Sequence, residues 1–387
     1  MSRVRPSAIR ELLQLGADPN IVSFGGGYPD PTLFPMEELR AIFDDLLVAE
    51  NALALQYTAS NGLPELRRQV AERLTRDGIS CGADDVLIIQ GGQQGLDLCA
   101  KLVIDAGEVV ITENPTFLGA LIAFNPYEPT YAAVRMDDDG MDMNHLEETL
   151  AAHPDAKMIY TVPDFQNPTG VTLGAERRQR LIELANSYQV LVVEDTPYRA
   201  LRYDGGHLPT LKSLDTQGRV IHLGSFSKIL APGLRLGWAV ASEEILPRLS
   251  LLKLAADTQS STLNMAATSA YLAQYDLAAH IAQALPVYRH KRDLMLETMG
   301  SSFPSSVSFT RAEGGLFTWL TFPTGFDAAD FMRQDLLPKA RVAFVPGATF
   351  FPVVEEPNHA RLSFSGVPDE QLVSGITAIG KLLHARL

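Results

Sequence analysis

Ser225-Phe226-Ser227-Lys228, with Arg235 seven residues further on, is the stretch that points most directly to a fold and a chemistry. Two hydroxyls and a guanidinium at this spacing can hold a phosphate dianion. A lysine amine kept partly neutral among cationic and apolar neighbours can attack a carbonyl and form a Schiff base. The simpler interpretation is a surface lysine in a serine-rich loop, so the rest of the chain has to decide between the two.

A predicted buried acid lies upstream, and it fits a small molecule that carries both a phosphate and an aldehyde. Residues 190–195 form a β-branched, apolar run that predicts a buried strand ending on Asp195. A carboxylate at the carboxyl end of a parallel strand stands where α/β folds bind ligands. Pyridoxal 5′-phosphate (PLP) combines an aldehyde, a phosphate and a pyridine nitrogen that such an acid keeps protonated. The alternative for Asp195 is a turn acid or a helix N-cap.

A glycine-rich turn offers a second phosphate contact. It begins at Gly91, after the predicted strand 86–90, and opens a helix. The backbone N–H groups of Gly92 and Gln93 can approach an anion at the positive end of that helix. The turn has neither the spacing of a P-loop nor that of a dinucleotide fingerprint, so nucleotide binding loses support.

Three side chains after predicted strands can contact a pyridine ring. Asn167 follows strand 158–162 and begins Asn-Pro-Thr-Gly, so its amide can donate to the phenolate oxygen of PLP. Tyr198 is a second donor to that oxygen. Phe117 can lie flat on the ring, although a core aromatic is the alternative for it.

In order and spacing, these motifs resemble the class I/II aminotransferases of PLP fold type I. The resemblance runs from Ser23-Phe24-Gly25-Gly26-Gly27 to Arg361-Leu362-Ser363-Phe364. The stretch 7–12, together with the Gly25 to Gly27 loop, is most similar to the 2-aminoadipate/kynurenine aminotransferase branch. One departure is Gln93 where the family often has Ser or Ala, but backbone donors do not depend on that side chain.

The resemblance implies a complete cofactor site. It makes Lys228 the Schiff-base lysine and the base that moves a proton at the substrate Cα, and Asp195 the partner of the ring nitrogen. Tyr57 resembles the tyrosine that reaches across a homodimer to the other subunit's phosphate. The implied catalytic residues are Lys228, Asp195 and Tyr198. The implied cofactor-binding residues are Gly92, Gln93, Phe117, Asn167, Asp195, Tyr198, Ser225, Ser227, Lys228, Arg235 and Tyr57.

The resemblance also implies a substrate end. Arg361 is similar to the arginine that grips the substrate α-carboxylate in a bidentate fork, with Asn167 and Gly26 beside it. Arg10 and Tyr28 lie in the segment that covers the site mouth in the family. If Arg10 points inward it can pair with a distal carboxylate, and if it swings out it leaves room for aromatic or aliphatic side chains. A solvated surface arginine is the equal alternative for Arg10.

The expected function is therefore PLP-dependent transfer of an amino group between an L-amino acid and a 2-oxo acid. We expect glutamate and 2-oxoglutarate as one pair, and 2-aminoadipate, an aromatic or an aliphatic amino acid as the other. Another PLP reaction on the same scaffold, such as β-elimination or decarboxylation, is the first alternative. A non-enzymatic, aminotransferase-like sensor domain is the second.

Net charge, cysteine and histidine content, and the lack of long apolar runs exclude several classes of protein. The chain has 387 residues, and its net charge of −14 argues against nucleic acid and anionic membrane as partners. Two cysteines give no disulfide framework, and Cys99 falls on the apolar side of a predicted helix. The eight histidines have no ligand spacing, so we expect no metal. No signal-peptide pattern and no long apolar run occur, so a cytoplasmic enzyme is expected.

The periodicity predicts an α/β fold with two domains. Between 86 and about 241, strands and helices alternate, which predicts a mostly parallel, seven-stranded-type sheet flanked by helices. A smaller α+β domain follows, to which the N-terminal segment returns in the family. The expected division is 1–35, 36–285 and 286–387, with Pro286 starting or kinking the longest helix. Further helices are expected at 7–15, 36–49, 63–77, 327–339 and from Pro368, and further strands at 306–310, 316–321, 342–346 and around Arg361.

Overall fold

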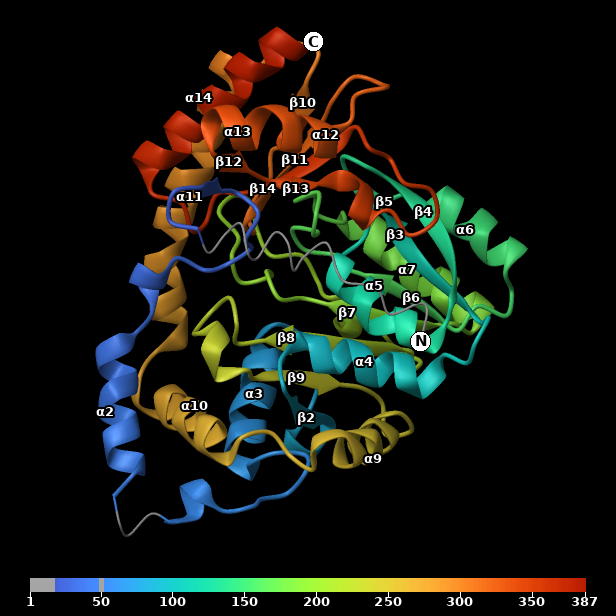
Figure 1. Ribbon diagram of the computed structural model, residues 1–387. Coiled ribbons are helices and arrows are strands. Elements are labelled where there is room, and N and C mark those ends of the chain that lie inside the picture. Colours follow the sequence, from blue (N-terminus) through green and yellow to red (C-terminus); the bar gives the residue numbers. More distant parts are fainter. Residues whose placement is uncertain (1–17, 49–51) are drawn as a thin grey trace.

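The computed structural model describes residues 18–48 and 52–387, arranged around one large sheet and one small sheet (Figure 1). The strands of the large sheet lie in the order β2-β9-β8-β7-β6-β3-β4-β5. Their bounds are β2 (Val86–Ile89), β3 (Val109–Asn114), β4 (Thr130–Asp137), β5 (Gly140–Met141), β6 (Met158–Thr161), β7 (Leu191–Asp195), β8 (Val220–Ser225) and β9 (Gly237–Val240).

The large sheet is mostly parallel, as predicted. Strands β4, β3, β6, β7 and β8 pair in parallel, whereas β9 runs antiparallel to both β2 and β8. The two-residue strand β5 adds an antiparallel edge beside β4. The central parallel strands β6, β7 and β8 are buried on both faces, because helices cover both sides of the sheet, whereas β4 near the edge is partly exposed.

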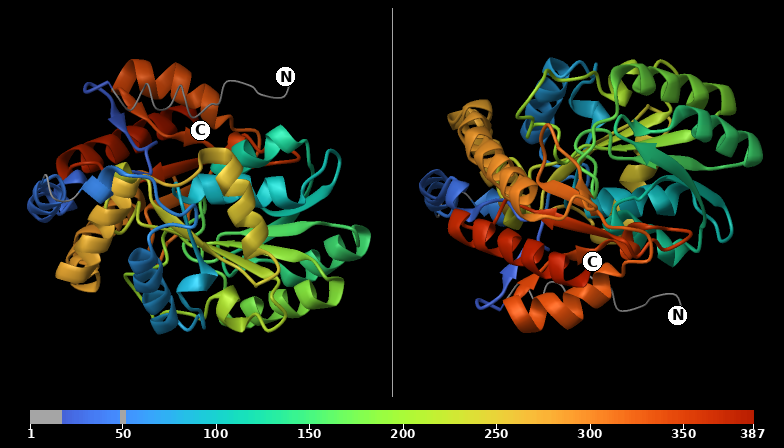
Figure 2. Two further views of the ribbon diagram at one scale, coloured as in Figure 1. Left: turned by 90° about the horizontal axis from the view of Figure 1, so that it is seen from below. Right: turned by 90° about the horizontal axis from the view of Figure 1, so that it is seen from above.

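Helices lie on both faces of the large sheet (Figure 2). Because successive side chains of a strand alternate between the two faces, they divide between these two helix layers. On β7, Val193 packs in the core with α4, and Val192 packs in a separate core with α6 and α7. Asp195 therefore faces the α4 side, and Glu194 faces the opposite side. The α4 side carries α4 (Gly92–Val103), α5 (Leu118–Phe124) and α9 (Leu246–Asp257), and the opposite side carries α3 (Pro64–Arg76), α6 (Met143–Ala152), α7 (Ala175–Tyr188) and α8 (Leu211–Leu214).

Three further helices run along the flank of the molecule: α2 (Met36–Leu46), α10 (Thr262–Gln274) and α11 (Leu277–Ser302). Helix α11 begins at Leu277, where the Asp276 carboxylate accepts hydrogen bonds from the backbone N–H groups of Ala278 and Ala279. Pro286 lies inside α11, so of the two alternatives for it a helix start was wrong, and a kink stays a prediction. The expected division between 285 and 286 falls within this continuous helix, and the domain bounds stay a prediction.

The small sheet has the order β10-β11-β14-β13, and a separate pair joins β1 to β12. The predicted strand 342–346 is thus two short strands with different partners. The bounds are β1 (Val22–Ser23), β10 (Ser308–Phe309), β11 (Phe317–Thr321), β12 (Val342–Ala343), β13 (Val345–Pro346), β14 (His359–Ser363), α12 (Ala328–Phe331), a π-helical turn (Met332–Leu336), α13 (Leu337–Ala340) and α14 (Asp369–Arg386). Short 3-10 helices span Pro31–Leu33, Ala52–Leu55, Ala83–Asp85, Asn125–Tyr127, Pro232–Leu234 and Gly347–Phe350.

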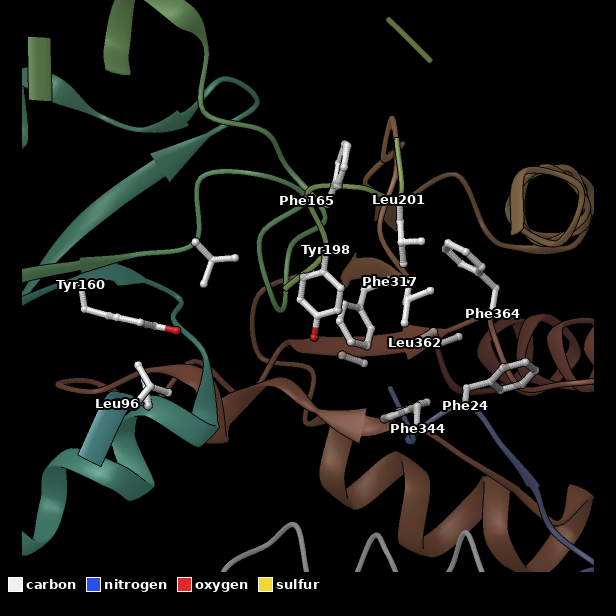
Figure 3. Close-up of a cluster of buried hydrophobic side chains, with 14 of the residues drawn as sticks. Phe24, Leu96, Tyr160, Phe165, Tyr198, Leu201, Phe317, Phe344, Leu362 and Phe364 are labelled. Atoms are coloured by element: carbon white, nitrogen blue, oxygen red, sulfur yellow. The ribbon is translucent and has the colours of Figure 1, made fainter. Parts of the chain in front are cut away.

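One hydrophobic core runs from the α4 side of the large sheet into the small domain (Figure 3). Phe24, next to β1, is fully buried in this core with Phe344 and Phe364. Burying one phenylalanine stabilises the fold by roughly 1.5–3 kcal/mol. The N-terminal strand is therefore anchored beside elements more than 300 residues later, and this fixes the loop that follows it.

Residues 18–48 and 52–387 contain two free cysteines, Cys81 and Cys99. Helices in these ranges include none that is long and apolar enough to cross a membrane. Nor do three or more His, Cys, Asp or Glu side chains gather there as metal ligands. Cys99 is buried, as expected, and burial raises the pKa of its thiol well above the ordinary value.

Candidate active site

A cavity of about 720 Å³ lies at the carboxyl ends of β7 and β8, between the large sheet and the small domain. Thirteen predicted site residues line it: Gly26, Tyr28, Gly92, Gln93, Phe117, Asn167, Asp195, Tyr198, Ser225, Ser227, Lys228, Arg235 and Arg361. Tyr57 does not line the cavity, and its side chain is 81% exposed. Arg10 and the helix predicted at 7–15 lie outside the described residues.

Asp195 is the buried acid of this cavity. It ends β7, is only 4% exposed, and accepts a hydrogen bond from the Tyr160 hydroxyl at 3.0 Å. Burial raises the pKa of Asp195 to about 6, against the hydrogen bond from Tyr160 and the charge of His222, which lower it. A cationic ligand group at this carboxylate would offset the cost of its burial.

Tyr160 is a site residue that the sequence reasoning missed. The register of β6 and β7 pairs Tyr160 with Val193, two residues before Asp195, so the phenol and the carboxylate share one face of the sheet. A tyrosine within a predicted buried strand was an available signal, because a buried hydroxyl needs a hydrogen-bond partner. Only the strand order identifies that partner.

Lys228 lies in the turn after β8, and its amine points into the cavity. Nζ donates a hydrogen bond to the carbonyl oxygen of Gly27 at 2.8 Å. Burial lowers the pKa of Lys228 to about 8, and the positive charges of Arg361 and Arg235 act in the same direction. A lysine amine with this pKa can exchange a proton near neutral pH and act as a nucleophile.

The predicted phosphate contacts converge from two turns. The Oγ of Ser225 accepts a hydrogen bond from the backbone N–H of Ser227 at 3.1 Å, which closes the turn before Lys228. Gly91 precedes α4 with φ of +74°, and a Cβ there would stand 2.8 Å from the Arg235 guanidinium. Glycine at 91 thus allows Arg235 to lie against the start of α4, where backbone N–H groups favour an anion.

A hydrogen-bonded chain crosses the cavity at its other end. The Asn167 amide donates to the Tyr198 hydroxyl at 3.2 Å, and Arg361 Nη1 donates to the Asn167 carbonyl oxygen at 2.9 Å. Arg361 Nη2 donates to the carbonyl oxygen of Gly25 at 2.7 Å. Burial raises the pKa of Tyr198 to about 12 and lowers the pKa of Arg361 to about 10.

Aromatic rings hold the Arg361 guanidinium in place. Its central carbon lies 4.3 Å from the centroid of the Phe317 ring and 5.2 Å from that of Phe350. Phe317 also packs edge to face with Tyr198, with centroids 5.5 Å apart (Figure 3). Sequence reasoning missed both phenylalanines and the Gly25 and Gly27 carbonyls, because no local pattern reveals contacts between segments so far apart.

These features define a class of protein. A mostly parallel sheet whose carboxyl edge carries a buried acid, a lysine and two turns with donors that an anion could accept from has the arrangement that PLP requires. The side chains fit that cofactor: Tyr160 is the only hydrogen-bond partner of the Asp195 carboxylate among the described residues, and Lys228 has a lowered pKa. The fold and the cavity are those of a PLP-dependent enzyme of fold type I.

Comparison with known proteins extends this assignment. The family model "Aminotransferase class I and II" matches residues 25–379, so the chain belongs to the class I and II aminotransferases. It is 38% identical to the aromatic-amino-acid aminotransferase 1 of Thermococcus litoralis, over 99% of this chain and 93% of that protein.

Solved structures agree with the fold. The kynurenine aminotransferase of Pyrococcus horikoshii, solved with PMP, is 39% identical and superposes with a TM-score of 0.94, over 99% of this chain and 96% of that one. The α-aminoadipate aminotransferase of Thermus thermophilus, complexed with N-(5′-phosphopyridoxyl)-L-leucine, is 36% identical with a TM-score of 0.92 and the same coverage. The expected cofactor and enzyme class are thereby confirmed: the chain is a PLP-dependent transaminase.

Proposed function

We propose that this enzyme transfers the amino group between glutamate/2-oxoglutarate and a larger amino acid, which is 2-aminoadipate or has an aromatic or aliphatic side chain. The observation that carries the proposal is one cavity that holds both Lys228 and Arg361, the latter hydrogen-bonded to Asn167. PLP, when bound, withdraws the electrons of a cleaved Cα bond.

At the cofactor end, Lys228 would hold PLP through Nζ and, once released, carry the proton at that nitrogen. Its pKa of about 8 suits this task, because a base works best when its pKa is near the working pH. Asp195 would hold the ring nitrogen as an ion pair, and Asn167 and Tyr198 would donate to the ring oxygen. Ser225, Ser227, Arg235 and the backbone at Gly92 and Gln93 would hold the phosphate, with Phe117 against the ring.

At the substrate end, Arg361 would bind the α-carboxylate in a two-point fork. Its Nη2 now donates to the Gly25 carbonyl and its buried Nε has no partner among the described residues, so a carboxylate would gain both donors. Gly26 and Tyr28 lie next to this position. The side-chain region is lined by apolar residues, Leu118, Val345, Phe350 and Val367 among them, which supports aliphatic and aromatic substrates.

Recognition of a dicarboxylate would need a further cation. Among the described lining residues the basic side chains are Lys228, Arg235 and Arg361, each with a role above. Arg10 remains the candidate for the distal carboxylate of glutamate or 2-aminoadipate. An Arg10→Ala variant should lose kcat/KM for dicarboxylates and change little for leucine. An equal fall in kcat/KM for dicarboxylates and for leucine would rule out recognition of the substrate side chain by Arg10.

We also propose a homodimer in which Tyr57 reaches the other subunit's phosphate. The Tyr57 side chain is exposed, although its loop is tied to the start of α10: the Thr58 N–H donates to Gln259 and Thr262 donates to the Gln56 carbonyl. Large apolar side chains are exposed on the preceding 3-10 helix and on α9: Leu53, Leu55, Leu251 and Leu254. Such residues are typical of an interface. Sedimentation showing an active monomer would contradict the dimer.

A substrate panel tests the proposed function. Purified enzyme receives 2-oxoglutarate with L-leucine, L-phenylalanine or L-2-aminoadipate, and both the new 2-oxo acid and glutamate are measured. We expect the two products in equal amounts, and none with Lys228→Ala. Borohydride reduction and peptide mapping should place the pyridoxyl group on Lys228. Ammonia or carbon dioxide in place of glutamate would favour elimination or decarboxylation, and a label on Lys157, Lys212 or Lys253 would overturn the role of Lys228.

A further inference from the structure

A second cavity, of about 300 Å³, lies behind the first. We call it the back pocket; its walls come from the end of α3, the segment 196–207, strands β8 and β9, and the first turns of α11. Pro197 and Ser225 line both cavities. On β9, Trp238 packs in the core on the α3 side of the sheet, so the back pocket opens on the face opposite to α4. No role proposed above accounts for it.

The back pocket is rich in positive charge. Arg73, Arg76 and Arg199 line it, whereas Asp77 is the one acidic residue of its described lining. The Arg73 side chain makes no hydrogen bond or ion pair with any described residue. Burial lowers the pKa of its guanidinium, the charge of Asp77 raises it, and the charge of Arg76 lowers it further. Burial also lowers the pKa of His207, and the charge of Arg199 acts in the same direction. An anion placed among these groups would relieve their mutual repulsion.

Two buried donors of the back pocket have no partner in the described chain. Trp238 is 5% exposed, and its Nε1–H is unpaired. The Nε of Arg199 is likewise buried and unpaired, although the same guanidinium binds the Asp164 carboxylate at 3.2 Å. Buried donors without acceptors are costly and rare, so an acceptor from a bound molecule is the expected complement.

The remaining wall of the back pocket is apolar. Leu74 from α3, Ile229 after β8, and Ile281 and Leu285 from α11 form it. Small-molecule sites combine such a wall with a few convergent polar groups, and a volume near 300 Å³ is at the lower end of their range. Inorganic ions would use the polar groups and leave the apolar wall without a contact.

We propose that the back pocket binds a small organic anion, with a carboxylate or phosphate head at Arg73, Arg199 and Trp238 and a short hydrocarbon body against Leu74 and Ile281. Strand β7 connects this pocket to the catalytic cavity. His222 lines the back pocket and pairs with Glu194 at 2.9 Å, and Glu194 precedes Asp195 on β7. A ligand in the back pocket would thus lie close to strand β7, which carries Asp195.

The test is direct binding to the holoenzyme, measured by calorimetry with three probes: isovalerate, phenylacetate and inorganic phosphate. Arg361→Ala serves as the background, because it removes the carboxylate contact of the catalytic cavity. We expect one of the two organic acids to bind saturably there, and Arg73→Gln in that background to weaken it at least tenfold. Trp238→Phe should also weaken it, and a crystal structure of the complex should place the carboxylate of the bound acid at Arg73.

Arg68→Gln is the matched control, because Arg68 is on the same helix but pairs with Glu65 and Glu72 at the surface. It should leave binding unchanged. No saturable binding by any probe would overturn the proposal, as would equal binding in Arg73→Gln or loss of binding with Arg361→Ala alone. Binding of phosphate but of neither acid would rule out an organic ligand. Transamination by Arg73→Gln should stay near wild type, which separates failure of this site from failure of the proposed function.

Discussion

The two ends of the catalytic cavity are built in different ways. The cofactor end comes from the segments that follow β2, β3, β6, β7 and β8, all strands of one sheet. The substrate end brings Arg361 from the small sheet against Asn167 from the large domain and Gly25 from the N-terminal loop. Local motifs therefore determine the cofactor end, whereas the substrate end exists only when three distant segments pack together.

Substitutions at the two ends should therefore have different effects. Changes at the cofactor end should alter the chemistry for every substrate. Changes at the substrate end should alter kcat/KM and leave the cofactor bound. The hydrogen bond from Arg361 to Asn167 is the direct link between the two ends, at 2.9 Å.

The largest effect is expected for Asp195→Asn. The amide keeps the shape but removes the charge opposite the ring nitrogen, so kcat should fall by several powers of ten, each power being about 1.4 kcal/mol of barrier. PLP absorbance should fall much less, because the phosphate contacts remain. Tyr160→Phe is the control: it removes one hydrogen bond to Asp195 and keeps the charge, so it should cost far less. Near-normal turnover of Asp195→Asn would contradict its role.

A pH-dependent loss of stability is the second expectation, for the PLP-free enzyme. Burial raises the pKa of folded Asp195 to about 6 from 3.8, so the folded state holds this proton more tightly than the unfolded state. Stability from this group is therefore present below about pH 4 and is lost as pH rises through 6, by up to about 3 kcal/mol.

Urea unfolding of the PLP-free wild type and of Asp195→Asn tests whether stability falls as pH rises. The amide mimics the neutral carboxyl, so the variant should be more stable than wild type at about pH 8, and the gap should shrink near about pH 4.5. The same difference at both pH values would mean that Asp195 does not titrate in this range.

A third expectation concerns the substrate end. Arg361→Lys keeps a positive charge but loses the planar fork that lies over Phe317, so kcat/KM should fall about a hundredfold, near 3 kcal/mol, for every amino acid. PLP content, measured by absorbance after dialysis, should stay the same. Loss of PLP together with activity would show that Arg361 also contributes to cofactor binding.

The smallest effect is expected for Tyr57→Phe. A phenol hydroxyl contributes one hydrogen bond to a phosphate that several other groups also hold, so PLP retention should weaken by about 1.5 kcal/mol. The affinity for PLP, titrated into the cofactor-free enzyme, measures this. Leu251→Glu on α9 should weaken dimer formation instead, which distinguishes the hydrogen bond from the interface.

Most residues of the cofactor end could be predicted from the sequence alone. Strand periodicity places Asp195 at the end of a buried strand, and the spacing of Ser225, Ser227 and Lys228 lies within one turn, so their relative positions follow from local backbone geometry. The same periodicity predicted the mostly parallel sheet. Such inferences succeed because successive residues of a strand or turn have few conformations to choose from.

The contacts between segments distant in the sequence could be found only in the tertiary structure. Tyr160 meets Asp195 because β6 and β7 are neighbours in a particular register, and sequence periodicity does not specify strand order. The Gly25 and Gly27 carbonyls meet Arg361 and Lys228 because Phe24 is buried beside the small sheet. The back pocket likewise combines α3, β9 and α11. The physical reason is common to all three: packing between distant segments depends on the shape of the whole core, which no short stretch of sequence encodes.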